Sequence, residues 1–151
     1  MPRLLVLIDL QKNYIREEPK EMKYILQTID KFKAPIICLT CEDLSGLSIL
    51  PSIRRVLKNK RTIYIDKIGN DGSKEVMEAI KLLGMNPQEI VADVMGCFTE
   101  CCVTETVAGL AGSNRIKKIR IHSNGVISDD RDEGSLAIKE MKRWPRVRIL
   151  R

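Results

Sequence analysis

The sequence predicts an α/β fold: a three-layer α/β/α sandwich around a mostly parallel six-stranded sheet. Short apolar runs alternate along the chain with segments in which apolar residues recur every three or four positions, as in strands followed by helices. The runs are continuously apolar rather than alternating, which is typical of strands covered by helices on both faces. A length of 151 residues with no linker or repeat indicates a single domain, residues 1–151.

Six apolar runs predict the strands. The first is followed directly by Asp9, and the third is followed, after one residue, by Lys67. The fourth ends at Gly96 and the fifth at His122, the only histidine of the chain. The predicted strands are residues 4–8, 34–40, 62–65, 89–95, 118–122 and 147–150.

Five segments between these runs predict helices. The clearest opens near Pro19, a residue favoured in the first turn of a helix, and its apolar face extends to Phe32. Ser73 and Thr99 are predicted to cap two further helices. Pro51 interrupts the shortest helix. The predicted helices are the segment from about Pro19 to Phe32 and residues 47–57, 73–83, 99–112 and 133–143.

The composition excludes several classes of protein. Hydrophobic residues make up 44% of the chain and charged residues 30%, as in soluble globular proteins rather than disordered ones. No apolar run approaches the roughly 18 residues that a membrane span needs. The first run is cut off by Asp9, too early for a secretory signal. We therefore expect a cytoplasmic protein without a membrane partner.

The basic net charge leaves a nucleic-acid partner as an alternative. The chain has 26 Lys and Arg residues against 20 Asp and Glu, a formal charge of +6. Its richest stretch, residues 54–61, lies where a helix is predicted to end, and cations are favoured at helix C-termini. Only 4% of the residues are aromatic, so few side chains are present to stack on bases. We expect no nucleic-acid partner.

The five cysteines raise the alternative of a zinc site. Cys38 and Cys41 form one group, and Cys97, Cys101 and Cys102 form the other. Cys38 and Cys41 are three residues apart at the end of a predicted strand, so their sulfurs point to opposite faces. The simpler interpretation of Cys38 is a small buried hydrophobic residue.

Three polar side chains are predicted to meet at one edge of the sheet. Asp9 and Lys67 follow strands, and Cys102 lies in the first turn of the helix after the fourth strand. In parallel sheets, ligands bind outside the carboxyl ends of the strands. A lysine and a helix N-terminus both favour the thiolate form of a cysteine, and a carboxylate can move its proton. Taken singly, each residue also has an ordinary structural interpretation: a loop cap, a surface charge and a packed thiol.

The motifs around these residues resemble the isochorismatase-like cysteine hydrolases. Residues 9–14, Asp-Leu-Gln-Lys-Asn-Tyr, are similar to that family's D-x-Q-x-x-[FY] opening, and Lys67 is similar to its catalytic lysine. Residues 96–103, with Thr106 after them, resemble its G-x-x-T-x-x-C-V-x-x-T nucleophile segment. Residues 123–125 stand where the family often has Asp-Ala after the fifth strand. The resemblance covers roughly the whole chain and implies the strand order 3-2-1-4-5-6.

The resemblance implies a mechanism for a small amide or carbamoyl substrate. Cys102 would attack the carbonyl carbon and form a thioester, Asp9 would act as general base and then general acid, and Lys67 would stabilise the developing charge. A cis peptide bond is implied between Cys97 and Phe98. The backbone N–H groups of Phe98 and Cys102 would form an oxyanion hole.

The remaining implied features are the pocket walls, the cofactors and the partners. Tyr14 and Phe98 are candidates for apolar walls of the substrate pocket, with core packing as the alternative. No cofactor is expected, the only ligand is a small-molecule substrate, and family members usually self-associate, so a homo-oligomer is expected.

The chain departs from the family in one segment. Nicotinamidases of the family carry an Asp-x-His metal motif after the second strand, where this chain has residues 41–46 without a histidine. A nicotinamidase-type metal site is therefore not expected. The segment is also shorter than usual in the family, which leaves the alternative of a catalytically silent interaction protein. Cys97 and Cys101 are open to a further interpretation, as partners for an oxidised Cys102.

Overall fold

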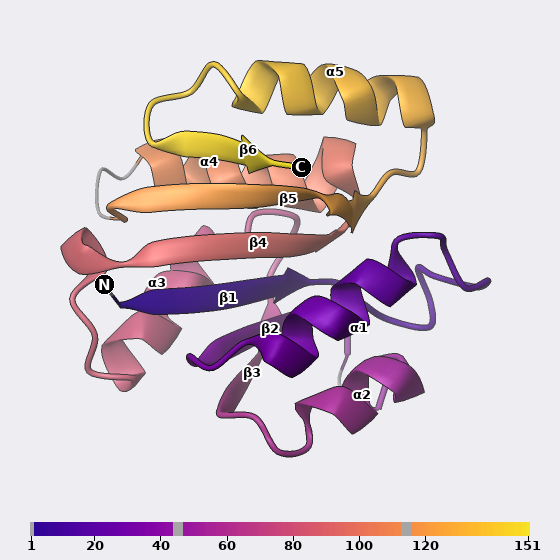
Figure 1. The fold of residues 1–151 in the computed structure, drawn as a ribbon, viewed down its shortest axis with the longest axis horizontal. Coiled ribbons are helices and arrows are strands. Elements are labelled where there is room, and N and C mark those ends of the chain that lie inside the picture. Colours follow the sequence, from indigo (N-terminus) through magenta and orange to yellow (C-terminus); the bar gives the residue numbers. More distant parts are fainter. Residues whose placement is uncertain (1, 44–46, 113–115) are drawn as a thin grey trace.

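One parallel sheet runs through the centre of the molecule (Figure 1). The structure is a computed structural model that describes residues 2–43, 47–112 and 116–151. Its six strands are parallel and lie in the order β3-β2-β1-β4-β5-β6, which confirms the predicted fold class and strand order. The strands are β1 (Arg3–Ile8), β2 (Ile36–Cys41), β3 (Thr62–Lys67), β4 (Val91–Cys97), β5 (Lys118–Ile127) and β6 (Val147–Leu150).

Helices cover both faces of this sheet (Figure 1). One face packs against α1 (Met22–Lys31) and α2 (Pro51–Leu57). The other packs against α3 (Ser73–Leu82), α4 (Thr104–Gly112) and α5 (Arg131–Met141). A π-helical turn, Thr99–Val103, precedes α4, and a short 3-10 turn, Pro87–Glu89, precedes β4. Within the described part of the chain, no helix is long and apolar enough to cross a membrane.

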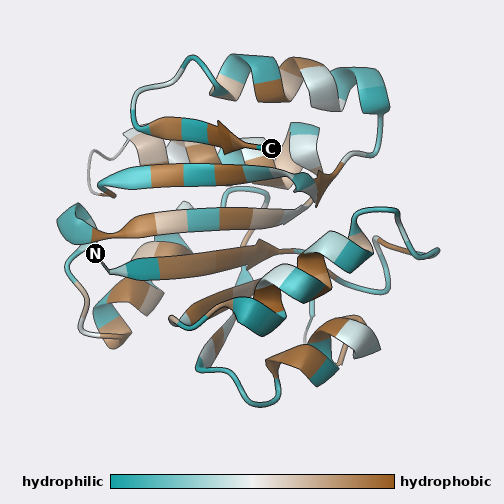
Figure 2. Ribbon diagram, viewed as in Figure 1, coloured by the Kyte–Doolittle hydropathy of each residue, from teal (hydrophilic) through white to brown (hydrophobic). Residues whose placement is uncertain are grey.

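Strand β1 shows why its run is continuously apolar. Leu5 and Leu7 belong to the core under α1 and α2, whereas Leu4, Val6 and Ile8 belong to the core under α3 and α4. All five are fully buried, and the hydropathy colouring shows the central strand as an apolar band (Figure 2). Burying each such side chain stabilises the fold by about 1.5–3 kcal/mol relative to leaving it exposed. The carboxyl end of β1 is therefore anchored in the core on both faces of the sheet.

Strand β5 is longer than predicted, and this corrects two placements. His122 was expected to end the strand and residues 123–125 to follow it, but all of them lie within β5. The physical reason is a shift in register: Val94 pairs with Ile121, whereas Gly96 pairs with Val126. The additional residues of β5 are accommodated in an irregularity of the ladder, which apolar periodicity does not reveal.

Three predicted helix starts are also corrected. Gly72 rather than Ser73 is the N-cap of α3, and the Asp71 side chain accepts the Ser73 N–H at 2.8 Å. Thr99 does not cap a regular helix but is the first residue of the π-helical turn. Pro51 does not interrupt α2; it occupies the first turn, where its missing N–H costs nothing.

Candidate functional site

Asp9, Lys67 and Cys102 meet at the carboxyl edge of the sheet, as the sequence predicts. Lys67 Nζ lies 3.1 Å from Asp9 Oδ2 and 3.5 Å from Cys102 Sγ. All three residues are buried. A carboxylate, an ammonium group and a thiol in mutual contact are the groups that a cysteine nucleophile, its base and its charge partner would require.

The backbone around Asp9 places its side chain at this edge. Asp9 directly follows β1 and has a positive φ of 53°, so the chain turns sharply as it leaves the sheet. Its N–H donates to Leu39 O at 3.0 Å, and its carbonyl accepts from the Cys97 thiol at 3.0 Å. Gly96 allows β4 to approach, because a Cβ there would lie 2.2 Å from Ile8 O. The peptide bond Cys97–Phe98 is cis, as the resemblance implies.

The ammonium group of Lys67 has its donors occupied. Besides Asp9 and Cys102, it donates to Gly69 O at 2.9 Å. A lysine has three N–H bonds, so these three partners account for all of them. Lys67 therefore holds the carboxylate and the sulfur in place and has no spare donor for a substrate.

The pKa of Cys102 corrects one expectation from the sequence. The helix N-terminus and Lys67 were expected to favour the thiolate, which means a pKa below the ordinary value. Instead, burial and the Asp9 carboxylate outweigh Lys67 and raise the pKa of Cys102 to about 12. Cys102 therefore rests as a thiol, and formation of its thiolate would require a base.

Asp9 is placed to be that base. Burial raises the pKa of Asp9 above its ordinary value, although Lys67 and Cys102 oppose the shift. Burial opposes the charged form of Lys67 as well, but the Asp9 carboxylate and Cys102 together raise its pKa. Among the described residues, Asp9 Oδ1 has no hydrogen-bond partner although it is buried. A buried acceptor without a partner is costly in a native fold and is typical of functional sites.

Two polar residues that the sequence did not single out for the site lie beside it: Asn70 contacts Cys102, and Gln11 donates its backbone N–H to the Asp9 carbonyl at 2.8 Å. The Cys102 thiol donates to Asn70 Oδ1 at 3.6 Å. The side chain of Gln11 binds the backbone of Cys41 from both directions, donating to its carbonyl at 3.0 Å and accepting its N–H at 2.7 Å. Gln11 belongs to the quoted opening motif, which was the signal for it. Asn70 had no such signal, because its loop lies outside every motif.

The predicted pocket walls lie together. The rings of Tyr14 and Phe98 meet edge to face with centroids 6.3 Å apart. Both are partly buried. Burial and the neighbouring Cys41 raise the pKa of the Tyr14 hydroxyl. Both rings pack against the core on the side of the sheet that α1 and α2 cover.

The residues after β2 do not fit the metal site of a nicotinamidase. The motif position holds Cys41, Glu42 and Asp43, with no histidine. The Asp43 carboxylate accepts the Ser48 N–H at 3.3 Å, so it serves the local turn. Over residues 2–43, 47–112 and 116–151, no three His, Cys, Asp or Glu side chains gather as a metal ion requires. Residues 44–46 of the predicted metal segment lie outside the described residues.

The other cysteines differ from Cys102 in their surroundings. Cys38 is buried in the core, and burial raises its pKa to about 12, which agrees with a packed hydrophobic residue. Cys97 is also buried, and its thiol donates a hydrogen bond to the Asp9 carbonyl. Cys101, next to the nucleophile in sequence, is only partly buried and lies 4.0 Å from the Glu105 carboxylate. The proposed pairing of Cys97 or Cys101 with an oxidised Cys102 stays a prediction.

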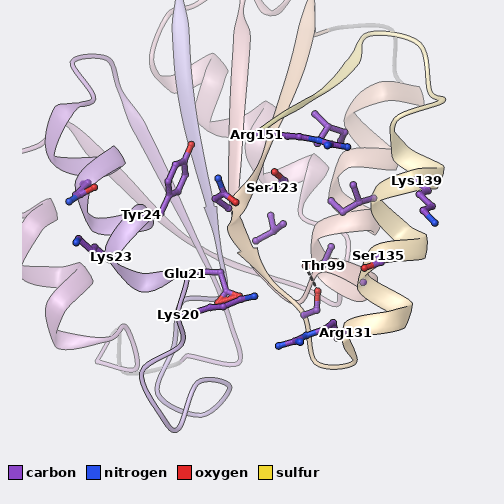
Figure 3. Close-up of a pocket in the computed structure, with 17 residues that line it drawn as sticks. Lys20, Glu21, Lys23, Tyr24, Thr99, Ser123, Arg131, Ser135, Lys139 and Arg151 are labelled. Atoms are coloured by element: carbon purple, nitrogen blue, oxygen red, sulfur yellow. Dashed lines mark hydrogen bonds between the residues drawn. The ribbon is translucent and has the colours of Figure 1, made fainter.

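A separate cleft of about 930 Å³ lies between α1 and α5, over β5 (Figure 3). Figure 3 shows Lys20 and Arg131 at the same end of the cleft, near Thr99. Thr99 connects the two regions, because it lines the cleft and also begins the π-helical turn that carries Cys102. The charged residues that line the cleft are Lys20, Glu21, Lys23, Arg131, Lys139 and Arg151.

Comparison with known proteins defines the class of fold. No protein-family profile and no curated protein sequence matches the chain. Solved structures do match, and they show that the chain has the fold of the isochorismatase-like hydrolases. The likeness that the motifs suggest is therefore confirmed at the level of the fold.

Three solved structures illustrate the range of proteins to which the chain is similar in fold. The nicotinamidase PncA from Bacillus subtilis matches with a TM-score of 0.82 over 100% of both chains, at 14% identity. An isochorismatase-like hydrolase from Alkaliphilus metalliredigens matches with a TM-score of 0.79 at 11% identity, over 99% of this chain and 86% of that one. The MAR1 ribonuclease from Caenorhabditis elegans matches with a TM-score of 0.79 at 18% identity, over 98% of this chain and 76% of that one.

Proposed function

We propose that this protein is a metal-independent cysteine hydrolase that cleaves the C–N bond of a small amide or carbamoyl compound. The observation that carries the proposal is the contact of Lys67 with both Asp9 and Cys102 in a buried site. The fold supports it, because solved structures with this fold include proteins named as nicotinamidases. A buried thiol, its base and a cation form the set that acyl transfer through a thioester needs.

In the first half of the reaction, the substrate carbonyl carbon meets Cys102 Sγ. The thiol proton passes to Asp9 Oδ1, the oxygen without a partner among the described residues, while the S–C bond forms. Lys67 holds the thiolate as it develops, because it already contacts the sulfur. The tetrahedral intermediate then releases the nitrogen, which takes the proton back from Asp9. The products are a thioester on Cys102 and a free amine or ammonia.

In the second half, water replaces the nitrogen. Asp9 removes a proton from the water, whose oxygen attacks the thioester carbonyl. The collapse of this second intermediate breaks the S–C bond, and the proton returns to Cys102. The backbone N–H groups of Phe98 and Cys102 are proposed to hold the oxyanion in both halves, since all three ammonium donors of Lys67 are already occupied. Tyr14 and Phe98 are proposed as apolar walls for the substrate.

The test is release of ammonia or amine from a panel of small amides and carbamoyl compounds. Cys102→Ala is expected to abolish the activity on any substrate found, and Cys101→Ala is the matched control next to it in sequence. Mass spectrometry of the reaction quenched in acid is expected to show the acyl group on the peptide that carries Cys102. Full activity in Cys102→Ala, or an acyl group on another residue, would overturn the mechanism.

A chain that hydrolyses no compound of the panel while its Cys102 titrates as an ordinary exposed thiol would favour the alternative of a silent interaction protein. Self-association, which the family resemblance implies, is tested separately by light scattering after gel filtration. The result expected is a mass above that of the 17.2 kDa protomer.

We propose no nucleic-acid ligand, and the cleft between α1 and α5 is the place where this expectation can be tested. The cleft between α1 and α5 is lined by five cationic side chains and one acidic one. One solved structure with the same fold is named a ribonuclease. Cations bind a phosphate backbone with an affinity that falls steeply with salt. We expect no such binding, so a salt-dependent affinity for single-stranded RNA that Lys20→Ala and Arg131→Ala weaken would reverse our expectation.

A further inference from the structure

Thr106 is a buried residue to which the proposed reaction gives no task. It lies in α4, one helical turn after Cys102, and its side chain is fully buried. Its hydroxyl accepts the Gly72 N–H at 2.9 Å and approaches the carbonyl of Asn70 at 3.4 Å. One hydroxyl therefore binds both ends of the segment 70–72. That segment connects the end of β3, where Lys67 lies, to the start of α3.

The segment 70–72 is packed tightly as well as bonded. A Cβ on Gly72 would lie 2.6 Å from the Leu39 side chain and 3.1 Å from the stem of Lys67. The backbone thus approaches β2 and the site lysine as closely as a glycine allows. The place of Asn70 is therefore fixed on one side by this packing and on the other by Thr106.

The side chain of Asn70 reaches the nucleophile. Its Oδ1 accepts the Cys102 thiol at 3.6 Å, while the described residues leave Asp9 Oδ1 unpartnered. The thiol thus has two acceptors in the site, a neutral amide and a carboxylate. A hydrogen bond to the amide fixes the direction of the sulfur but cannot remove its proton, because an amide oxygen is far too weak a base. Only transfer to Asp9 generates the thiolate.

We propose that Asn70, held in place by Thr106, is a positioning residue for the Cys102 thiol. In the resting site its amide oxygen holds the thiol hydrogen and sets the direction of the sulfur. When a substrate enters, this hydrogen bond breaks and the proton passes to Asp9 Oδ1 as the S–C bond forms. Asn70 itself neither gains nor loses a proton. The proton transfer to Asp9 on substrate entry rests on the proposed function. The resting hydrogen bond between the Cys102 thiol and Asn70 is independent of it.

The resting arrangement is testable on the thiol alone, without a substrate. The probe is iodoacetamide, and the quantity measured is the second-order rate constant of Cys102 alkylation against pH, read by peptide mass mapping. Asn70→Asp has nearly the same shape as asparagine but places a carboxylate at the sulfur. A like charge so close disfavours the thiolate, so alkylation is expected to slow by about tenfold at a given pH.

The dependence on Thr106 is tested by repeating Asn70→Asp in two backgrounds. Thr106→Val keeps the volume and removes the hydroxyl, whereas Thr106→Ser keeps the hydroxyl. The slowing by Asn70→Asp is expected to fall to less than about threefold in the Thr106→Val background and to persist in the Thr106→Ser background. Such non-additivity between two residues measures their coupling. Thr106→Ala replaces Thr106→Val if the valine variant does not fold, as judged by the melting temperature of each variant.

Two results would overturn the inference: an alkylation rate that Asn70→Asp leaves unchanged, or the same slowing with and without the Thr106 hydroxyl. Its failure is distinguishable from failure of the proposed function. If the alkylation rates show no coupling between Asn70 and Thr106 while hydrolysis still depends on Cys102, only the role of Asn70 is refuted. If the rates show the coupling but no compound is hydrolysed, only the proposed reaction is refuted. Where a substrate is found, Thr106→Val is expected to lower kcat with KM unchanged, and Thr106→Ser to restore it.

Discussion

Two buried carboxylates on neighbouring strands have opposite surroundings. Asp93, inside β4, is fully buried and binds the Arg120 side chain at 2.6 and 3.0 Å, with Arg3 on its other side. Asp9, at the end of β1, has one lysine and one oxygen without a partner among the described residues. Burial alone raises the pKa of both carboxyls, but His122 and the two arginines hold the pKa of Asp93 well below its usual value.

The difference shows why a buried carboxylate can stabilise the fold at one position and be open to protonation at another. A carboxylate whose oxygens are met by arginines stays ionised at every working pH, so it contributes structure and no proton transfer. A carboxylate that is buried with too few donors is easily protonated, and such groups cluster at functional sites. The sequence singles out Asp9, which follows a predicted strand and opens the quoted motif, but not Asp93, which lies inside a predicted strand. Their roles depend on how many donors face them.

The largest effect is expected from Asp9→Asn on the proposed hydrolysis. Asparagine keeps the shape of the side chain but cannot accept the thiol proton, so kcat/KM is expected to fall by about 10³-fold, within the range for loss of a general base. The measurement is ammonia release from the substrate found in the amide panel. Asp93→Asn is the matched control, because it makes the same chemical change one strand away. An equal loss of activity per folded molecule in both variants would contradict the assignment.

The second largest effect is expected on stability, and it comes from Asp93→Asn rather than from Asp9→Asn. Asp93→Asn leaves Arg120 and Arg3 without their anion. Their side chains are 27% and 46% exposed, so water compensates part of the loss, and the cost is expected to be about 1–2 kcal/mol of unfolding free energy, less than for a fully buried pair. For a domain of this size the melting temperature is expected to fall by roughly 2–8 °C. Calorimetry or denaturant unfolding measures this loss. A variant as stable as the parent protein would show that the arginines are well solvated without Asp93.

Most of the fold was predictable because it depends on apolar periodicity. The runs that became β1 and β2 are buried on both faces, so packing and local preference agree along them. The irregularity opposite Gly96 was not predictable, because it depends on the register between β4 and β5 rather than on either segment alone. The same limit placed His122 at a strand end, whereas it lies inside β5 with its Nδ1 2.7 Å from the Tyr24 hydroxyl.

The site was predictable in its residues and not in its electrostatics. The rule on strand ends brought Asp9, Lys67 and Cys102 together, because each position follows from the end of an element. The direction of the pKa shift of Cys102 did not follow, since it depends on burial and on distances to both charges. Asn70 was not predictable for a related reason: its contact with the thiol is set by Thr106, which is 36 residues away in sequence.

The pH dependence of stability sharpens the comparison. The pKa of Asp93 is lowered in the folded state, so its contribution is present above the ordinary value of 3.8 and is lost as the pH falls below it. The pKa of Asp9 is raised, so its contribution is present below 3.8 and is lost as the pH rises through the raised value. Between neutral and acid pH, the free energy of unfolding of Asp93→Asn is therefore expected to fall by about 1–2 kcal/mol less than that of the parent protein. Asp9→Asn is expected to lose as much stability on acidification as the parent protein does. A parent protein whose unfolding free energy does not change at acid pH would contradict the stabilising role of Asp93.

The smallest effect concerns the thiol that Asp9 faces. Burial and Asp9 together raise the pKa of Cys102 to about 12, and Lys67 opposes this. In Asp9→Asn the lysine remains while the carboxylate is gone, so the pKa of Cys102 is expected to fall and its alkylation by iodoacetamide at neutral pH to accelerate about tenfold. The same substitution thus abolishes hydrolysis and activates the sulfur toward a reagent that needs no base. If Cys102 instead rested as a thiolate formed by proton transfer to Asp9, its alkylation would become slower in Asp9→Asn, because the group that takes the proton would be missing. Slower alkylation in Asp9→Asn, with the buried Cys38 unreactive as the reference, would show that Cys102 rests as a thiolate.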